Sequence, residues 1–369
     1  MIEHRPGTRI KATLLLWINI FLIPSTAIFA EEKSASPRPT LPNASPDEPI
    51  APRFSAARAS SALDQLAVDW TKKNHCGTCH TNYPYLMAKP AFLANGTADS
   101  AMAEVRGYFE NRVRHWDDSE KSAKPRWDAE VVSTAAALAI NDQLTTGKLH
   151  ETTRKALDRM WALQKPEGAW NWLKAKLPPY EYDDYYGALV AALGVGYAPD
   201  HYATGESARK GVDSLRNYFK KNPPPNLHHE AFLLWASTRL DGLMSFEQRN
   251  RTVHRLRSLQ RPDGGWCLPS LGEWERHDGS SNDPKAPSDG YATGLVVHVL
   301  RQAGIPAADP TLVKGVAWLK NNQRESGRWF TRSLNTDNKH YISNAGTAFA
   351  VMALHACDAI DAKDVTGAR

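Results

Sequence analysis

Two kinds of helical segment alternate along the chain from Ser55 onward. In the first kind, apolar residues recur every three or four positions and charged residues fill the remainder, which is typical of a helix with one buried face. In the second kind, small and apolar residues occupy every side, which indicates a helix that is buried all round. The first kind covers residues 56–74, 100–116, 151–164, 206–221, 246–260 and 310–323, and the second covers residues 83–94, 128–142, 183–197, 228–240, 289–303 and 343–358.

This alternation predicts an all-α fold. No stretch of useful length shows the two-residue alternation of apolar and polar side chains that a strand requires. We expect an (α/α)6 toroid, a single barrel in which six outer helices surround six inner helices and a central cavity. Each outer helix ends at a turn before the next inner helix starts, so the turns and the N-termini of the inner helices should share one mouth of the barrel.

Three of these turns carry the same spacing, Q-x-x-x-G-x-W. The copies run from Gln164 to Trp170, from Gln260 to Trp266 and from Gln323 to Trp329. They resemble the QW motifs of the squalene-hopene cyclase and oxidosqualene cyclase family, whose α/α toroid is shared with protein prenyltransferase β-subunits. We expect each indole to stack on the end of an outer helix and each Gln amide to reach the backbone of the next turn. These residues are therefore interpreted as structural.

Length and composition favour one folded domain. The chain has 369 residues, of which 42% are hydrophobic, whereas the resembled cyclases carry two barrels in a longer chain. Basic residues precede an apolar run at 12–23, and Ala30 stands before two glutamates, which predicts a signal peptide over residues 1–30, with an uncleaved anchor as the alternative. Residues 31–54 are rich in Pro and Ser and are interpreted as a disordered tether, residues 55–360 as the toroid, and residues 361–369 as a tail.

The sequence Cys76-Gly77-Thr78-Cys79-His80 has the spacing of a c-type haem attachment motif. Two thiols at this spacing add to the two vinyl groups of haem, and the adjacent His presents its imidazole to the iron. The predicted export signal strengthens this prediction, because c-type haem is attached outside the cytoplasm. The alternatives are a disulfide between Cys76 and Cys79 and a zinc site that also uses His75 and His80. The other two cysteines, Cys267 and Cys357, are predicted at opposite mouths and should be free thiols.

This motif replaces a repeat turn. Aligning the first outer segment with the last puts Trp70 on Trp318 and His75 on Gln323, so C-G-T-C-H stands where the turn should be. A haem there would face the mouth that holds the inner-helix N-termini. Met87 is the first candidate sixth iron ligand after the motif in sequence. Further candidates are Met102, His75 and His115.

Glu181-Tyr182-Asp183-Asp184 precedes an inner helix and resembles the D-x-D-D motif of class II terpene cyclases, with Glu in place of the first Asp. In that family, the acid that matches Asp183 is kept protonated and donates its proton to an alkene. The resemblance therefore implies that Asp183 is a catalytic acid with Glu181 and Asp184 beside it. A cap at the start of the inner helix is the alternative, because the helix dipole favours acidic residues there.

Other inner segments also begin with polar residues. A metal site formed by His228, His229, Glu230 and Asp289 is one alternative, by analogy with the zinc of prenyltransferases. The remaining polar residues, Asp128, His340 and Asn344, are interpreted as caps or as satisfied buried groups. An aromatic wall suited to an isoprenoid is expected from Trp127, Trp172, Tyr180, Tyr182, Tyr185, Tyr186 and Tyr291.

Three hypotheses about function follow. The haem motif favours an exported, periplasmic c-type haem protein. Its cavity would bind a hydrophobic, isoprenoid-like or quinone-like molecule for redox chemistry. This hypothesis includes a redox partner protein and is compatible with membrane association. The resemblance implies instead a class II cyclase in which Asp183 donates the proton. The third hypothesis is a non-catalytic electron carrier or binding module. Loss of residues 1–30 removes three basic residues and one acidic residue, which lowers the net charge from +5 to +3, so no nucleic-acid partner is expected.

Overall fold

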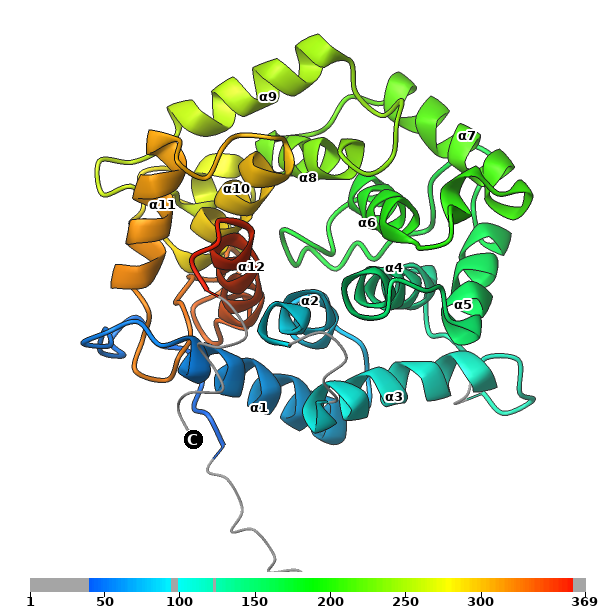
Figure 1. Cartoon of the computed structure of the whole chain (residues 1–369), viewed down its shortest axis with the longest axis horizontal. Coiled ribbons are helices and arrows are strands. Elements are labelled where there is room, and N and C mark those ends of the chain that lie inside the picture. Colours follow the sequence, from blue (N-terminus) through cyan, green and yellow to red (C-terminus); the bar gives the residue numbers. More distant parts are fainter. Residues whose placement is uncertain (1–39, 94–98, 122–123, 361–369) are drawn as a thin grey trace, which may run out of the picture. The chain divides into compact units, whose positions relative to one another are not determined.

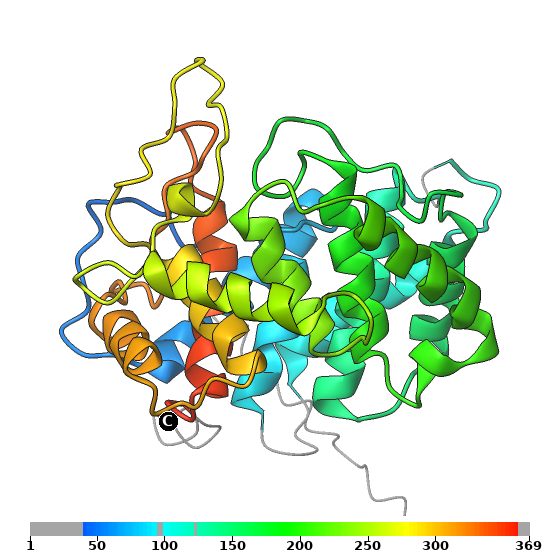
Figure 2. The same cartoon turned by 90° about the horizontal axis from the view of Figure 1, so that it is seen from above.

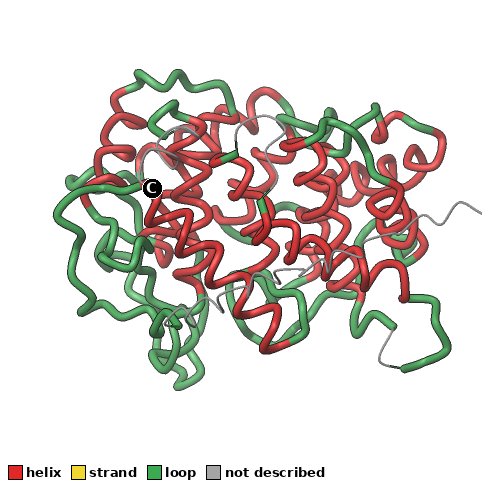
Figure 3. Tube along the Cα trace, turned by 60° about the horizontal axis from the view of Figure 1, so that its bottom comes forward, coloured by secondary structure: helices red, strands yellow, loops and turns green. Residues whose placement is uncertain are grey.

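The computed structural model describes residues 40–93, 99–121 and 124–360. Within these ranges the regular elements are helices, and strand pairing is limited to isolated bridges (Figure 3). The outer helices are α1 (Ala56–Asn74), α3 (Ser100–His115), α5 (Glu151–Ala162), α7 (Glu206–Lys221), α9 (Phe246–Ser258) and α11 (Pro310–Asn321). The inner helices are α2 (Asn82–Ala88), α4 (Asp128–Thr145), α6 (Asp184–Tyr197), α8 (Leu227–Ser237), α10 (Gly290–Gln302) and α12 (Ile342–Ala356). Figure 1 shows the outer set surrounding the inner set, which confirms the predicted (α/α)6 toroid.

The inner helices are buried because small and apolar side chains cover all their sides. In α6, every residue from Tyr185 to Val195 is buried. Small residues also allow neighbouring inner helices to approach closely, since a Cβ atom on Gly194 would lie 2.6 Å from the Cα atom of Ala136 in α4. The outer helices bury one face, and α9 buries only Thr252 and Leu256. The two burial patterns match the two sequence patterns.

Each Q-x-x-x-G-x-W turn joins its own outer helix to the next one. The indoles donate to the carbonyl oxygen ten residues earlier at 2.7–2.8 Å: Trp170 to Met160, Trp266 to Leu256 and Trp329 to Leu319. Each Gln amide donates to the carbonyl of its own turn glycine and to a second carbonyl at or near the start of the next outer helix: Gln164 to Gly211, Gln260 to Thr311 and Gln323 to Ser55. The last of these ties joins α11 to α1 and closes the ring.

Two features of these turns require glycine. The φ angle is positive in all three copies, at +102° for Gly168, +90° for Gly264 and +88° for Gly327. A Cβ atom would also lie 2.3–2.8 Å from a backbone carbonyl oxygen of the next outer helix. The repeated glycine therefore serves helix packing as well as the turn.

The turns and the inner-helix N-termini share one mouth, as expected. The backbone N–H of Asp289, at the start of α10, donates to the carbonyl of Trp266 at 2.8 Å. The backbone N–H of Trp329 donates to Thr347 Oγ1 in α12 at 3.2 Å. In Figure 2, the long green, yellow and orange connections that lead into α6, α10 and α12 project from the same side of the ring.

Residues 40–54 differ from the expected disordered tether, because they lie against the last repeat turn. The backbone N–H of Ala51 donates to the carbonyl of Gln323 at 2.7 Å. Arg328 is 1% exposed, and its guanidinium donates to the carbonyl of Pro42 at 2.8 Å and pairs with Glu48 at 3.2 Å. A proline-rich segment without apolar periodicity is ordered here through its backbone and one carboxylate.

The predicted signal peptide (residues 1–30), the first part of the tether and the tail (residues 361–369) lie outside the described residues. Within the described part of the chain, no helix combines the length and the apolar character that crossing a membrane would require.

Candidate functional site

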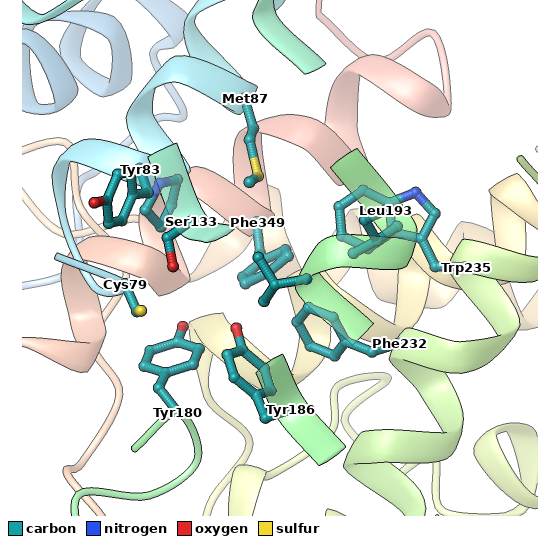
Figure 4. A pocket seen from close by; sticks show the side chains of 12 residues that line it. Cys79, Tyr83, Met87, Ser133, Tyr180, Tyr186, Leu193, Phe232, Trp235 and Phe349 are labelled. Carbon is teal, nitrogen blue, oxygen red and sulfur yellow. The ribbon is translucent and has the colours of Figure 1, made fainter. Parts of the chain in front are cut away.

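The inner helices enclose a small cavity whose wall combines aromatic rings with two sulfur-containing side chains (Figure 4). Its lining residues are Cys79, Tyr83, Pro84, Met87, Ser133, Tyr180, Tyr186, Val190, Leu193, Phe232, Trp235 and Phe349. About 40 Å³ is open to the centres of water-sized molecules, which is room for about three waters. The cavity is thus much smaller than a porphyrin or an isoprenoid chain.

The haem motif forms the turn between α1 and α2, and the buried side chain of Asn82 holds it. Asn82 Oδ1 accepts from the backbone N–H of Thr78 at 2.8 Å, and Asn82 Nδ2 donates to the carbonyl of Cys76 at 3.0 Å. Tyr83 covers Gly77 so closely that a Cβ atom there would lie 2.1 Å from the tyrosine hydroxyl. Asn82 was not predicted from the sequence, although its place two residues after the motif, where a repeat turn is absent, was a usable signal.

All four cysteines in the described residues are free thiols. The disulfide alternative for Cys76 and Cys79 is therefore not formed, and the expectation for Cys267 and Cys357 is confirmed. Burial, together with the negative charge of Glu181, raises the pKa of Cys79 to about 12. Such a thiol stays protonated at neutral pH, whereas zinc binds the thiolate. No group of three potential metal-ligating side chains (His, Cys, Asp or Glu) comes together among the described residues, which argues against the zinc alternative.

His80 lies outside the cavity wall, between two aromatic rings. Its ring stacks on Tyr341 at a centroid distance of 5.1 Å and meets the edge of Trp70 at 4.7 Å. Its Nδ1 atom lies 2.7 Å from Thr81 Oγ1, which accepts from the side chain of Asn344 at 3.0 Å. Burial lowers the pKa of His80 to about 4, so the imidazole is neutral at neutral pH. When Nδ1 carries the proton and donates it to Thr81, Nε2 keeps the lone pair that a metal needs.

Of the candidate sixth ligands, Met87 alone lines the cavity with Cys79. Met102 lies on outer helix α3 beside Asn141, and His115 bonds to the carbonyl of Asn111. His75 ends α1 in a left-handed conformation with its side chain exposed. The donor types match those of a c-type haem: two free thiols, an imidazole and a thioether. Cys79 and Met87 line a cavity that is too small for a porphyrin, and His80 lies outside that cavity, so haem binding would require this turn to rearrange.

The acid cluster is divided among different neighbours. Asp183 caps α6, accepting from the backbone N–H of Tyr186 at 3.0 Å, and it lies 3.2 Å from His229 Nε2. Burial would raise the pKa of Asp183, but the hydrogen bond and charge of His229 and the backbone N–H groups outweigh it and leave the pKa lowered. Asp184 forms ion pairs with Lys165 and Lys174. Glu181, whose pKa is raised by burial, is the member of the cluster near Cys79.

The four residues of the alternative metal site, His228, His229, Glu230 and Asp289, do not converge on a common point. His228 Nε2 lies 2.9 Å from the hydroxyl of Tyr291, and burial, with the nearby charge of His229, lowers the pKa of His228 well below its usual range. Glu230 pairs with Arg255 on the outer helix. Asp289 caps α10, and burial raises the pKa of its carboxyl to about 6.

The aromatic wall is also different from the expected one. Only Tyr180 and Tyr186 of the predicted set line the cavity, while Trp127 is 54% exposed and Tyr185 packs outward on Tyr218 and Phe219. The other aromatic lining residues, Tyr83, Phe232, Trp235 and Phe349, were not singled out from the sequence. A separate open groove of about 1290 Å³ lies at the mouth, and Tyr182, Asp183, Leu271 and Trp274 are among its lining residues.

Comparison with solved structures finds the same fold in proteins of low sequence identity. The ent-copalyl diphosphate synthase from Streptomyces platensis matches with a TM-score of 0.50 and 14% identity over 75% of this chain and 50% of that chain. The type II terpene cyclase MstE from Scytonema matches with a TM-score of 0.50 and 10% identity over 82% of this chain and 98% of that chain. The GH76A alpha-1,6-mannanase from Salegentibacter has a TM-score of 0.48 at 12% identity, over 80% of this chain and 98% of that chain.

At such identities the likeness concerns the fold alone, and this chain spans half the length of the copalyl diphosphate synthase. The protein thus has the α/α-toroid fold of the copalyl diphosphate synthase and the type II terpene cyclase. No family model matches the sequence, and no curated protein matches it significantly.

Proposed function

We propose that this protein is an exported, periplasmic c-type haem protein built on an α/α toroid, in which Cys76 and Cys79 attach the porphyrin and His80 binds the iron. The observation that carries the proposal is the arrangement of the motif at the barrel mouth. Both thiols are free, the His80 imidazole is neutral, and the tautomer in which Nδ1 donates to Thr81 leaves the lone pair of Nε2 for iron. The bound haem would supply one-electron redox chemistry.

Met87 is the proposed sixth ligand. It is the first candidate after the motif in sequence, and binding iron would require it to leave the cavity wall that it shares with Cys79. A thioether ligand raises the reduction potential relative to a second imidazole, which suits an electron carrier or an oxidase.

The proposed partners are a hydrophobic small molecule and a redox protein. The cavity is too small for an isoprenoid or quinone, so a ligand of that size would bind in the open groove, where Tyr182, Pro225 and Pro284 offer apolar surface. The groove and the haem motif share the mouth of the barrel.

The cyclase alternative requires a neutral acid that faces a dry cavity. Asp183 instead faces the groove and His229, and its pKa is lowered. These observations favour the haem function over the cyclase.

The proposal is tested by producing the full chain with and without a cytochrome c maturation system. We expect a Soret band and a mass increase of one haem only with that system. Cys76→Ala and Cys79→Ala should each abolish double thioether attachment. The His80→Ala variant should keep the porphyrin and show altered iron ligation.

Cys267→Ala is the matched control, because it removes a buried thiol outside the motif and should leave the spectrum unchanged. The proposal fails if the matured wild-type protein has no Soret band, or if it contains stoichiometric zinc instead.

A further inference from the structure

Two hydroxyl groups in the cavity wall lack a hydrogen-bond partner. Ser133, from α4, is 3% exposed, and Tyr180, from the connection before α6, is 5% exposed. Neither Ser133 Oγ nor the Tyr180 hydroxyl has a partner with good hydrogen-bond geometry. Their polar neighbours are the weakly accepting Cys79 thiol and the Tyr291 hydroxyl, which lies 2.9 Å from His228 Nε2. Figure 4 shows both hydroxyls pointing toward the same part of the cavity, together with that of Tyr186 and next to the sulfur of Cys79.

Buried polar groups of this kind are rare because an unpaired donor retains its desolvation penalty. A third hydroxyl in the same wall, that of Tyr83, is satisfied by Thr134 Oγ1 at 3.0 Å. The two unpaired donors therefore mark one spot, beside the hydroxyl of Tyr186 and the sulfur of Cys79, and the wall away from this spot is mostly apolar. The remainder of the wall includes Val190, Leu193, Phe232 and Phe349.

We infer that this cavity binds a small neutral molecule that has one oxygen acceptor, held by the hydroxyls of Ser133 and Tyr180, and a hydrocarbon remainder that contacts the aromatic wall. The free space of about 40 Å³ limits the molecule to about three or four non-hydrogen atoms. A small ketone, aldehyde or alcohol meets these conditions. A carboxylate does not, because no cationic side chain lines the cavity.

This inference deepens the proposed function, since Cys79, one of the two proposed haem attachment points, lines the same cavity. A molecule bound there would lie against the sulfur that holds the porphyrin. Binding to the cavity itself requires only the side chains of this chain, so it can be measured separately with and without haem.

Acetone and 2-methylpropene are the probes, because they have nearly the same shape and differ in the oxygen acceptor. Ligand-observed NMR titration of the full chain should show acetone binding at Kd values weaker than about 40 µM, the limit for four non-hydrogen atoms. 2-Methylpropene should bind about tenfold more weakly. Ser133→Ala and Tyr180→Phe should each weaken acetone binding by about tenfold and leave 2-methylpropene binding unchanged.

Tyr185→Phe is the matched control, because it removes an equally buried and unpaired tyrosine hydroxyl that does not line the cavity. It should leave both probes unaffected. Removing an unpaired hydroxyl should not lower the thermal unfolding midpoint, so loss of fold is excluded by the same samples.

Three results would each overturn the inference. The two probes could bind equally well, or Tyr180→Phe and Tyr185→Phe could have equal effects. The third is no acetone binding at all, which would leave water as the occupant. The titration is run on protein made with and without haem. Acetone binding by protein that never acquires haem would support the cavity site while refuting the proposed haem function. A haem-loaded protein that does not bind acetone would refute the cavity site while supporting the proposed haem function.

Discussion

The carboxylate of Asp183 shows how a neighbour decides the role of an acid. Its hydrogen bonds to the Tyr186 backbone and to His229 favour the ionised form, which is the opposite of what alkene protonation needs. Its place at the N-terminus of α6 was clear from the sequence. His229 is 46 residues away and was predicted as a metal ligand rather than as the partner of Asp183.

Asp183→Asn should therefore be a mild substitution. Asn is nearly as good a cap, so the free energy of unfolding at neutral pH should fall by about 1 kcal/mol or less. Because the pKa of Asp183 is lower in the folded chain than in the unfolded chain, its contribution is present above about pH 4 and is lost as the pH falls through the folded-state value. Denaturant unfolding of wild type and variant from pH 7 down to pH 3 should show this difference shrinking.

The same variant tests the cyclase alternative. Extracts from wild type and Asp183→Asn incubated with squalene and shorter linear isoprenoids should both lack cyclised products by mass spectrometry. Asp309→Asn, which changes the cap of outer helix α11, is the control for effects on stability alone. A product formed by the wild type and lost in Asp183→Asn only would restore the proton-donor role.

Among the elements, the repeat turns connect local conformation with packing. Gly327 and Gly304 have almost the same φ angles, +88° and +92°, but a Cβ atom on Gly327 would lie 2.3 Å from the carbonyl oxygen of Arg58, while the space around Gly304 is open. Ala at Gly304 should thus cost about 1–2 kcal/mol for the left-handed conformation alone. Ala at Gly327 should cost roughly 1–3 kcal/mol more, because α11 and α1 must move apart. Denaturant unfolding of the two variants measures the difference, and equal losses would contradict a role for close packing.

Across the whole described ring, closure depends on the N-terminal segment as well as on the helices. Glu48 pairs with the buried guanidinium of Arg328 and accepts from the backbone N–H of Ser326 at 2.8 Å. Glu48→Ala leaves that guanidinium without its carboxylate and should lower the free energy of unfolding by about 1.5–3 kcal/mol. Asp47→Ala, at the exposed neighbouring position, should change it by less than about 0.5 kcal/mol. Similar losses in both variants would indicate that the segment acts only through its backbone.

The alternation of helices and the repeat turns could be predicted because each depends on local features, and haem attachment at C-x-x-C-H stays a prediction from a local motif. Outer helices have one apolar face, turns need particular φ angles, and C-x-x-C-H is a contiguous sequence. The inner helices are apolar on every side. This pattern indicates that they are buried, but it does not indicate which side chains face the cavity and which face neighbouring helices.

Only the tertiary structure shows that Ser133 and Tyr180 line the cavity beside Cys79. It also shows that Asp183 pairs with His229, and that Glu48 pairs with Arg328, which is 280 residues away. These contacts depend on the rotation of each helix about its own axis in the closed ring. That rotation is set by the sum of all packing contacts, and no single stretch of the chain carries it.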